Sequence, residues 1–293
     1  MRSRYRNFYG AALVALLSAG VAAAVPAVAS AGAVPSVAKL VPAAIKSKGA
    51  ITVAADASYA PDEFVGPDGK TVVGMDADLS KALGAAMGLK VSIVNVTFAD
   101  IIPGMKAGRF QIGASSFTDT KKREKTVDFV DYANVGESFY TKAQGGTQIK
   151  SIANICGLTV SVETGTTEQA DAGTQSKKCT AAHKKAVTVL SFPNQNQANL
   201  AVSSGRAQLG FADTPVASYQ VKQNKGLFKL IGAAYATAPY GIAVEKTSGL
   251  TGAVKAALVY LIHTGKYQQI FAKWGVQSIE IPASQVKING ATS

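Results

Sequence analysis

Hydrophobic and polar positions between residues 51 and 113 follow two alternating periods. A short apolar run at Ile51–Ala54 predicts a buried strand, and Leu79, Leu83 and Met87 lie on one face of a helix that Gly88 ends. The next segments predict a strand at 91–96, a helix at 98–107 and a strand at 110–113. This order indicates a mainly parallel α/β sheet with right-handed crossovers.

Two details of this first unit depend on single residue types. Proline, glycine and aspartate gather over residues 59–69, which predicts a loop and turn there. Asp76 or Asp78 is expected to begin the helix that follows, because aspartate often caps the first turn.

The alternation returns in the middle of the chain. Strands are predicted at 158–162, 186–190 and 208–212, with helices at 167–176 and 195–204 between them. Two α/β units in one chain indicate two lobes. Two further helices are predicted at 250–263 and 266–274, and their apolar faces need a lobe to pack against.

Residues 1–31 have the order of a secretory signal: Arg2, Arg4 and Arg6, an apolar run over 11–25, and small residues ending at Ala31. The alternative is a membrane anchor, but only about 14 apolar residues precede Pro26, whereas a spanning helix needs roughly 20. We expect cleavage after residue 31, no lipid attachment at a cysteine, and a protein that is periplasmic or secreted. Residues 32–50 are expected to form a flexible lead-in with one short helix.

The two cysteines, Cys156 and Cys179, are 23 residues apart. Export puts them in an oxidising compartment, which favours a disulfide worth about 3 kcal/mol on the chain-entropy model. A redox or metal role is the alternative, but no cluster of other ligands lies nearby in the sequence. We expect no metal site and no cofactor.

The net charge is +12, and it falls to +9 without the first 31 residues. A basic chain suggests nucleic acid or an anionic membrane surface. The lysines, however, occur in short scattered groups without the interleaved aromatic residues of a single-strand binding groove. We interpret them as a solvated surface and expect no nucleic-acid partner.

Several short motifs carry a family resemblance. They are Tyr59-Ala60-Pro61, Gly74-Met75-Asp76-Ala77-Asp78-Leu79, Ile102-Pro103-Gly104-Met105, Thr120-Lys121-Lys122-Arg123, Gly165-Thr166-Thr167-Glu168 and Phe211-Ala212-Asp213. In this order and spacing the chain resembles the polar amino acid-binding proteins of ABC importers over about residues 50–280. The resemblance implies an amino acid ligand, an ABC permease and ATPase as partners, and a monomer.

The implied fold is the two-lobed clamp of the type II periplasmic binding proteins, each lobe a mainly parallel sheet flanked by helices. Residues 51–138 and 241–283 would form lobe 1, and residues 139–240 would form lobe 2. Hinge crossings are expected near Phe139 and Tyr240, since closure about such hinges sequesters a ligand. The expected disulfide then lies inside lobe 2.

The segment Ser115–Arg123 offers hydroxyl groups and one guanidinium, a combination that suits a carboxylate. The resemblance implies that Arg123 pairs with the ligand's α-carboxylate, with Ser115, Ser116 and Thr118 as neighbouring ligand-binding residues. Thr166 and Thr167 follow a predicted strand and begin a helix, where free N–H groups attract anions. The alternative is that these residues only cap helices and that Arg123 is a surface cation.

Asp213 follows a predicted strand at the edge where open α/β sheets hold ligands, and it would pair with the α-ammonium. Asp56 has the matching position after the first strand, although aspartate there is often only a turn former. The resemblance places Tyr59 and Phe98 beside the ligand's side chain, with core packing as the alternative for Phe98.

The resemblance also brings Asp62, Glu63, Glu163 and Glu168 near the pocket, and Glu163 is predicted to bind the ligand. Such an acidic site favours lysine, arginine, ornithine or histidine. Two positions depart from the family pattern: Asp62 replaces an aromatic residue, and Gln111 replaces an acid.

Two other functions share this fold. Some relatives are dehydratases of small carboxylic acids, and Glu163 could act as an acid or base. The only histidines, His183 and His263, read as surface residues, and we find no catalytic triad, metal-spaced cluster or phosphate loop, so we expect no enzyme. A sensory module that reports to a membrane receptor is the second alternative, which the sequence does not separate from transport.

Overall fold

The computed structural model describes residues 32–292, so the predicted signal segment at 1–31 lies outside the described residues. The strands are β1 (Ala50–Ala55), β2 (Ser58–Tyr59), β3 (Glu63–Val65), β4 (Val72–Val73), β5 (Lys90–Asn95), β6 (Ile112–Gly113), β7 (Val127–Lys142), β8 (Thr159–Glu163), β9 (Thr188–Phe192), β10 (Leu209–Asp213) and β11 (Phe228–Glu245). The helices are α1 (Pro35–Ala38), α2 (Ala43–Lys48), α3 (Met75–Met87), α4 (Phe98–Lys106), α5 (Lys121–Glu124), α6 (Thr167–Ala181), α7 (Gln195–Ser203), α8 (Thr214–Gln223), α9 (Thr251–His263) and α10 (Lys266–Trp274).

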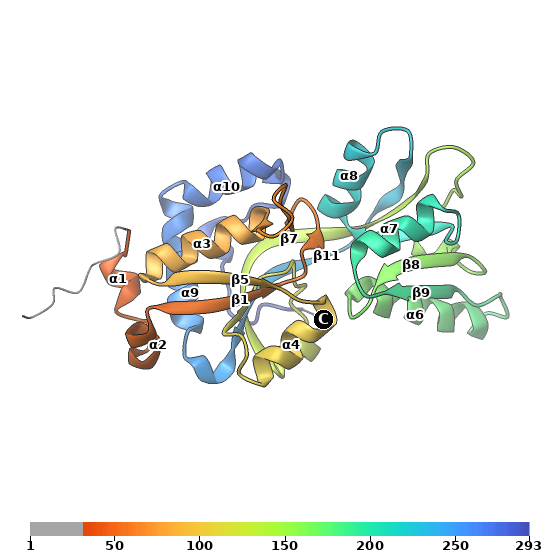
Figure 1. The fold of residues 1–293 in the computed structure, drawn as a ribbon. Helices are drawn as coiled ribbons and strands as arrows, with labels where there is room; N and C mark the ends of the chain where they lie inside the picture. Colours follow the sequence, from red (N-terminus) through yellow and green to blue (C-terminus); the bar gives the residue numbers. More distant parts are fainter. Residues whose placement is uncertain (1–31, 293) are drawn as a thin grey trace, which may run out of the picture.

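One eight-stranded sheet runs through the molecule in the order β5-β1-β6-β11-β7-β10-β8-β9 (Figure 1). At one end β1 pairs parallel with β5 and β6, and at the other end β8 pairs parallel with β9 and β10. The two outer parts are therefore parallel, as the alternation of strand and helix predicts.

The long strands β7 and β11 join the two halves. They pair antiparallel with each other from residue 127 to 142 on β7, and each is antiparallel to its outer neighbour. The register shifts between Ile231 and Gly241, where both strands pass from one half to the other. The residues predicted as hinge crossings, Phe139 and Tyr240, lie inside these strands.

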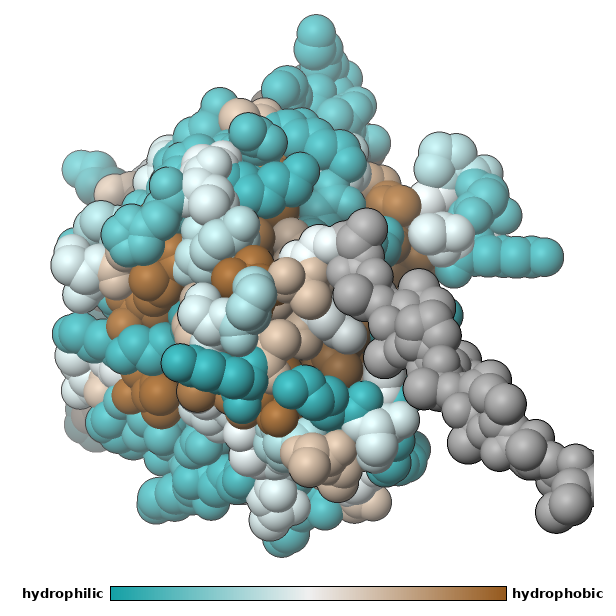
Figure 2. Space-filling model, turned by 90° about the vertical axis from the view of Figure 1, so that its left-hand side faces the viewer, coloured by the Kyte–Doolittle hydropathy of each residue, from teal (hydrophilic) through white to brown (hydrophobic). Residues whose placement is uncertain are grey.

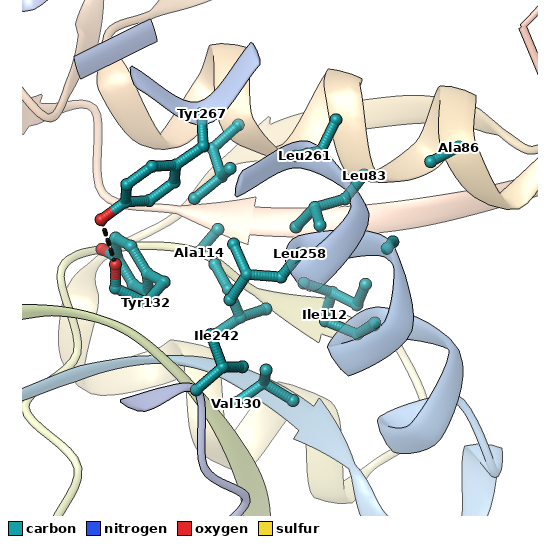
Figure 3. Close-up of a cluster of buried hydrophobic side chains, with 14 of the residues drawn as sticks. Leu83, Ala86, Ile112, Ala114, Val130, Tyr132, Ile242, Leu258, Leu261 and Tyr267 are labelled. Carbon is teal, nitrogen blue, oxygen red and sulfur yellow. Dashed lines mark hydrogen bonds between the residues drawn. The ribbon is translucent and has the colours of Figure 1, made fainter. Parts of the chain in front are cut away.

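The larger core fills the half that contains both ends of the described chain. Leu83 of α3 and Leu258 of α9 are buried against the sheet (Figure 3). Leu79 of α3 is buried in the same core. Tyr267 of α10 donates a hydrogen bond to the carbonyl of Tyr132 over 2.7 Å. The helices predicted at 250–263 and 266–274 thus pack on the first α/β unit, although more than 100 residues separate them in sequence.

A smaller core fills the other half. Phe139 and Phe211 stack with ring centroids 3.9 Å apart. Cys156 and Cys179 form the predicted disulfide, with Cα atoms 5.6 Å apart, and tie the segment before β8 to α6. The disulfide lies within this half, so it leaves β7 and β11 unconstrained.

Three short regions differ from the sequence expectation. Residues 59–69, expected as loop and turn, contribute to a small antiparallel sheet of β2, β3 and β4. Residues 32–50, expected as a flexible lead-in with one short helix, contain two helices, and Val37 is buried in the larger core. Asp76 does not cap α3, because Gly74 precedes the helix at φ 129°, where an added Cβ would lie 2.2 Å from the Asp62 carbonyl oxygen.

The surface of the larger half is mixed in polarity. On its outer face hydrophilic side chains surround smaller hydrophobic areas (Figure 2). Leu40 and Tyr260 are among the exposed apolar residues of the chain, at 45% and 39% exposure. Within residues 32–292, none of the helices has the length and apolar character needed to cross a membrane.

Candidate functional site

A nearly closed cavity, with a free volume of only about 10 Å³, lies between the two halves of the sheet. All eleven residues predicted to bind a ligand line it: Asp56, Tyr59, Phe98, Ser115, Ser116, Thr118, Arg123, Glu163, Thr166, Thr167 and Asp213. Glu63 and Glu168 complete the lining. The residues come from both halves, so the cavity depends on how closely the halves approach each other.

Arg123 forms one end of the cavity and bridges the two halves. It lies on the short helix α5, where the Thr120 side chain accepts a hydrogen bond from the Arg123 amide. Its guanidinium donates through Nη1 to the Thr118 carbonyl at 2.7 Å and through Nη2 to the Gly165 carbonyl at 3.0 Å. The carbon of the guanidinium is 5.3 Å from the centres of the Phe98 and Phe117 rings.

Among the described residues 32–292, no carboxylate forms a direct ion pair with the positive charge of Arg123. Burial is the largest influence and lowers the pKa of Arg123, while the nearby acids Glu168 and Asp213 act in the opposite direction. A guanidinium remains charged in proteins and presents a planar fork of donors. Arg123 therefore has the geometry to accept a carboxylate from within the cavity.

Ser115 and Ser116 are fixed by three buried acids, of which Asp62 and Asp76 lie behind the cavity wall and Glu63 lines the cavity. Ser116 has φ 48°, an uncommon conformation for a residue with a side chain, and its amide donates to Asp76 Oδ2 at 2.7 Å. The Ser115 hydroxyl donates to Glu63 at 2.8 Å, and the Ser116 hydroxyl donates to Asp62 at 3.0 Å. A strained backbone conformation of this kind persists only where contacts with the surrounding residues hold it, and it is common at binding sites.

Thr166 and Thr167 stand at the start of α6 in the other half. The Thr166 hydroxyl caps the helix by accepting from the Gln169 amide at 3.2 Å, and it donates to the Glu163 carbonyl at 2.8 Å. The Thr167 hydroxyl lies 3.3 Å from that of Thr118 across the cleft. The capping function is present, and the same helix start also faces the cavity.

Asp213 and Tyr59 meet across the cavity. The Tyr59 hydroxyl donates to Asp213 Oδ2 at 2.9 Å, and the Asp213 amide donates to the Tyr59 hydroxyl at 3.1 Å. Burial raises the pKa of Asp213 to about 6, although hydrogen bonds from tyrosines and the charge of Arg123 oppose the rise. A positive group in the cavity would stabilise the ionised form of this carboxyl.

Asp56 and Phe98 are linked at the edge of the first half. The Asp56 carboxylate accepts from the Phe98 amide at 2.9 Å through Oδ2 and from the Ser58 hydroxyl at 2.6 Å through Oδ1. Phe98 also stacks on Phe117, with ring centroids 4.5 Å apart. Asp56 thus anchors the start of α4 as well as lining the cavity.

Three glutamates give the cavity an excess of acid. Glu63, Glu163 and Glu168 are almost fully buried, and burial is the main reason that the pKa of each rises well above its usual value. Within the described part of the chain, one oxygen of Glu163 and one of Glu168 have no hydrogen-bond partner. Buried acceptors without a donor are costly, so these two oxygens favour a ligand that donates hydrogen bonds.

Some residues near the cavity have roles that sequence patterns do not indicate. Asp62 does not line the cavity; it is fully buried behind Ser116. Gln111 accepts from the Thr52 amide at 3.0 Å and so joins β1 to the start of β6. Glu137 lies on β7 beside Asp213, with one oxygen unpartnered, and no motif indicated it.

The lining has five carboxyl groups and one guanidinium. A ligand without net charge would not offset this excess of acidic groups over basic ones. Within the described part of the chain, no group of three or more potential ligands could hold a metal ion. The arrangement offers a cation for a carboxylate at one end and acids for positive groups elsewhere.

Comparison with known proteins gives consistent matches over most of the chain. A model of the bacterial extracellular solute-binding proteins, family 3, matches residues 51–277. The arginine-binding protein ArgT of Corynebacterium glutamicum is 36% identical over 245 residues, which cover 83% of this chain and 80% of that protein.

Two solved structures are similar in fold and sequence. An ancestral arginine-binding protein bound to arginine matches with a TM-score of 0.71 and 33% identity, over 77% of this chain and 98% of that one. An ancestral amino acid-binding protein described as a precursor of cyclohexadienyl dehydratase matches with a TM-score of 0.70 and 31% identity, over 79% and 97% of the two chains.

Proposed function

The chain belongs to family 3 of the bacterial extracellular solute-binding proteins, and we propose that it captures a cationic amino acid, with arginine as the preferred ligand. It has the type II periplasmic binding protein fold and is an amino acid-binding protein of the ABC importer class. The members of this class act outside the cytoplasm together with a permease and an ATPase. The choice of ligand is the part that needs further argument.

The unpartnered oxygens of Glu163 and Glu168 carry the proposal. A guanidinium has five N–H donors in one plane, which is enough to reach two separate carboxylates. An uncharged amide such as that of glutamine has two donors and no charge to offset the acids. The preference for arginine agrees with the ligands for which several relatives are named.

In this proposal the two zwitterion groups bind at opposite positions. Arg123 pairs with the α-carboxylate, supported by Thr118 and by the start of α6 at Thr167. Asp213 pairs with the α-ammonium, while the Tyr59 hydroxyl donates to one oxygen of the Asp213 carboxylate. Ser115, Ser116 and Thr166 shape the wall, and Phe98 and Asp56 border the side chain.

Calorimetric titration of residues 32–293, unfolded and refolded to remove copurified ligand, tests the proposal. We expect arginine to bind most tightly, followed by lysine and ornithine, with glutamine weaker. Arg123→Ala should weaken arginine binding by more than about tenfold, since charge-assisted hydrogen bonds contribute about 1.5–3 kcal/mol. A flat panel, or unchanged affinity in Arg123→Ala, would contradict the proposal.

Specificity is tested by removing acid without removing volume. Glu163→Gln and Glu168→Gln should weaken arginine binding and leave glutamine binding equal or stronger. Asp171→Asn, which changes an acid in the same half outside the cavity lining, is the matched control and should change neither. Equal losses for arginine and glutamine would show that these glutamates only support the fold.

Further parts of the proposal concern the whole protein. We propose cleavage of residues 1–31 on export, a monomer in solution, and two lobes that divide at residues 139 and 240. We also propose that the site binds without catalysis. Incubation of the protein with arginine, followed by mass spectrometry, should return the ligand unchanged, and any new product would favour an enzyme.

A further inference from the structure

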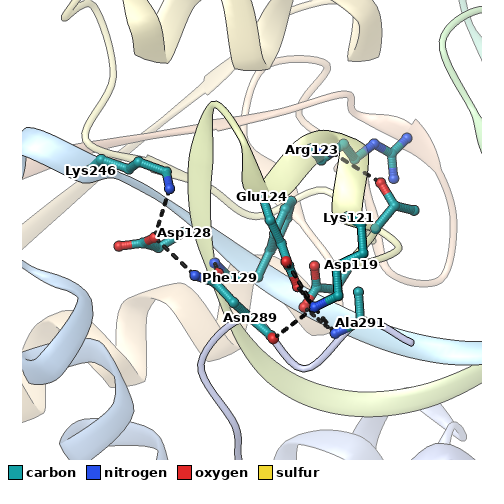
Figure 4. Close-up of polar contacts among 10 residues, drawn as sticks. Asp119, Lys121, Arg123, Glu124, Asp128, Phe129, Lys246, Asn289 and Ala291 are labelled. Atoms are coloured by element: carbon teal, nitrogen blue, oxygen red, sulfur yellow. Dashed lines mark hydrogen bonds and ion pairs between the residues drawn. The ribbon is translucent and has the colours of Figure 1, made fainter. Parts of the chain in front are cut away.

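The C-terminal segment, residues 287–291, lies beyond the part of the chain that matches the family model, which ends at residue 277. It runs along the half of β7 that belongs to the larger core (Figure 4). Val130 and Ile288 form an antiparallel bridge, and the Asp131 amide donates to the Lys287 carbonyl at 3.0 Å. The segment thus extends the sheet by a few residues.

Asn289 fixes the segment to β7 in three ways. Its amide donates to the Phe129 carbonyl at 3.1 Å, its Oδ1 accepts from the Phe129 amide at 2.8 Å, and its Nδ2 donates to Asp128 at 3.1 Å. This part of β7 pairs with β11 on one side only, so its other edge would expose unpaired backbone groups. The C-terminal segment covers that edge.

The last residues of the segment reach the turn that carries Arg123. The Ala291 amide donates to Asp119 Oδ2 at 3.1 Å and to Glu124 Oε1 at 3.2 Å (Figure 4). Asp119 and Glu124 stand on either side of Arg123, at the two ends of the turn into α5. One backbone donor therefore connects both flanks of the arginine.

Gly290 allows this close approach. An added Cβ at Gly290 would lie 2.1 Å from Asp131 Oδ2, and Asp131 is 3% exposed. A larger residue here would require either the buried Asp131 carboxylate or the segment to shift. The fit is therefore specific, although no residue of the segment lines the cavity.

We propose that residues 287–291 are a positioning element that holds Arg123 in place for the ligand carboxylate. The helix α5 has four residues and no buried ones, so its own packing contributes little to its position. Strand β11 supports the turn on one side, where the Asp119 amide donates to the Pro239 carbonyl at 2.9 Å. The C-terminal segment supports it on the other. This inference rests on the proposed pairing of Arg123 with a carboxylate.

A pair of truncations tests the proposal by calorimetry with arginine. The chain that ends at Val286 should bind arginine on the order of tenfold more weakly, because an unsupported arginine must be ordered on binding. The control ends at Ala291 and loses only Thr292 and Ser293, so its affinity should equal that of the full chain. Unchanged affinity in the shorter chain would overturn the proposal.

A point variant covers the case in which the shorter chain does not fold. Gly290→Ala should displace the segment and weaken arginine binding several-fold. Gly252→Ala is the matched control, because nothing lies within 4 Å of a Cβ added there. If Gly290→Ala folds, displaces the segment and binds arginine as tightly as the control, the positioning role is wrong.

Two measurements distinguish a positioning role of residues 287–291 from a contribution to the stability of the fold alone. Combined with Arg123→Lys, which keeps the charge and loses the fork, Gly290→Ala should cost little additional affinity, whereas a general loss of packing would add in full. The second readout is the NMR spectrum of the guanidinium groups, which is simple because residues 32–293 contain only three arginines, Arg109, Arg123 and Arg206. In Gly290→Ala we expect the signal of Arg123 alone to shift or broaden.

The same experiments distinguish failure of this inference from failure of the proposed function. If Arg123→Lys leaves arginine affinity unchanged, the proposed pairing of Arg123 fails, and the positioning role fails with it. If Arg123→Lys weakens binding but Gly290→Ala and the truncation do not, only the positioning role is overturned.

Discussion

Asp213→Asn should have opposite effects on ligand affinity and on the stability of the ligand-free protein. The substitution keeps the shape and an oxygen that can accept from Tyr59, whose hydroxyl lies 2.9 Å from Asp213 Oδ2. It removes the charge that we propose for the α-ammonium. A charge-assisted hydrogen bond contributes about 1.5–3 kcal/mol, so arginine should bind about 10- to 150-fold more weakly.

The stability change follows from the raised pKa of Asp213. Burial raises it from 3.8 to about 6 in the folded protein, and this difference corresponds to about 3 kcal/mol at neutral pH. Between these two values the folded protein binds more protons than the unfolded chain, so this carboxyl lowers stability as the pH rises. Asparagine lacks the ionised form, and the ligand-free variant should therefore unfold at higher denaturant concentration at pH 7.

Urea unfolding of refolded, ligand-free protein at about pH 4 and pH 7 measures the second effect, and calorimetry with arginine measures the first. The gain in stability should be large at neutral pH and should fall away at acid pH, where the wild-type carboxyl is protonated. A variant that is less stable at pH 7 and binds arginine normally would refute both the buried charge and its proposed role.

Three further changes test separate parts of the structure. Replacing Cys156 and Cys179 by alanine should lower the free energy of unfolding by about 3 kcal/mol, from the loop of 23 residues, with arginine affinity unchanged in calorimetry. Tyr59→Phe should weaken arginine binding only a few-fold, since a single hydrogen bond contributes about 1 kcal/mol; a loss of more than a hundredfold would contradict this view. Gly210→Ala should destabilise the protein in urea unfolding, because the new Cβ would lie 2.0 Å from the buried Tyr140 ring, whereas Gly173→Ala, with open space around it, should not.

Much of the outer fold follows from the chain's own patterns. The segments around Ile51, Leu79 and Leu258 each have one consistent period, and the structure forms a strand and two helices there. The disulfide also follows, because two cysteines in an exported chain have one possible pairing. These are local or compositional signals, which need no knowledge of distant contacts.

The centre of the sheet does not follow in the same way. β7 and β11 are buried on both sides at some positions and exposed at others, so their residues show no single period over 16 and 18 residues. Gly136 and Pro239 lie within them and would normally argue against a strand. Their strand form depends on pairing with each other, a contact about 100 residues apart.

The residues of the site also fall into two groups, those that local sequence patterns indicate and those that depend on contacts between distant parts of the chain. Asp213 and Thr167 stand at ends of predicted elements, where open α/β sheets hold ligands. Arg123 lies ten residues beyond the predicted strand at 110–113, and its proposed role comes from the family resemblance. Glu137 and the partners of Asp76 depend on which side chains meet inside the fold. The amide of Ser116 reaches Asp76 over 40 positions of sequence, and no spacing rule predicts that.

The order in which the core residues occur along the chain has a consequence for synthesis. The larger core includes Val37 near the start of the described chain and Val286 near its end. An emerging chain therefore lacks α9, α10 and the last part of β11 until almost all of it has been made, so this core is the last to close. The smaller core, which needs nothing after Tyr235, is available earlier. The larger core therefore cannot be completed before nearly the whole described chain has been made, and the two halves complete their cores one after the other.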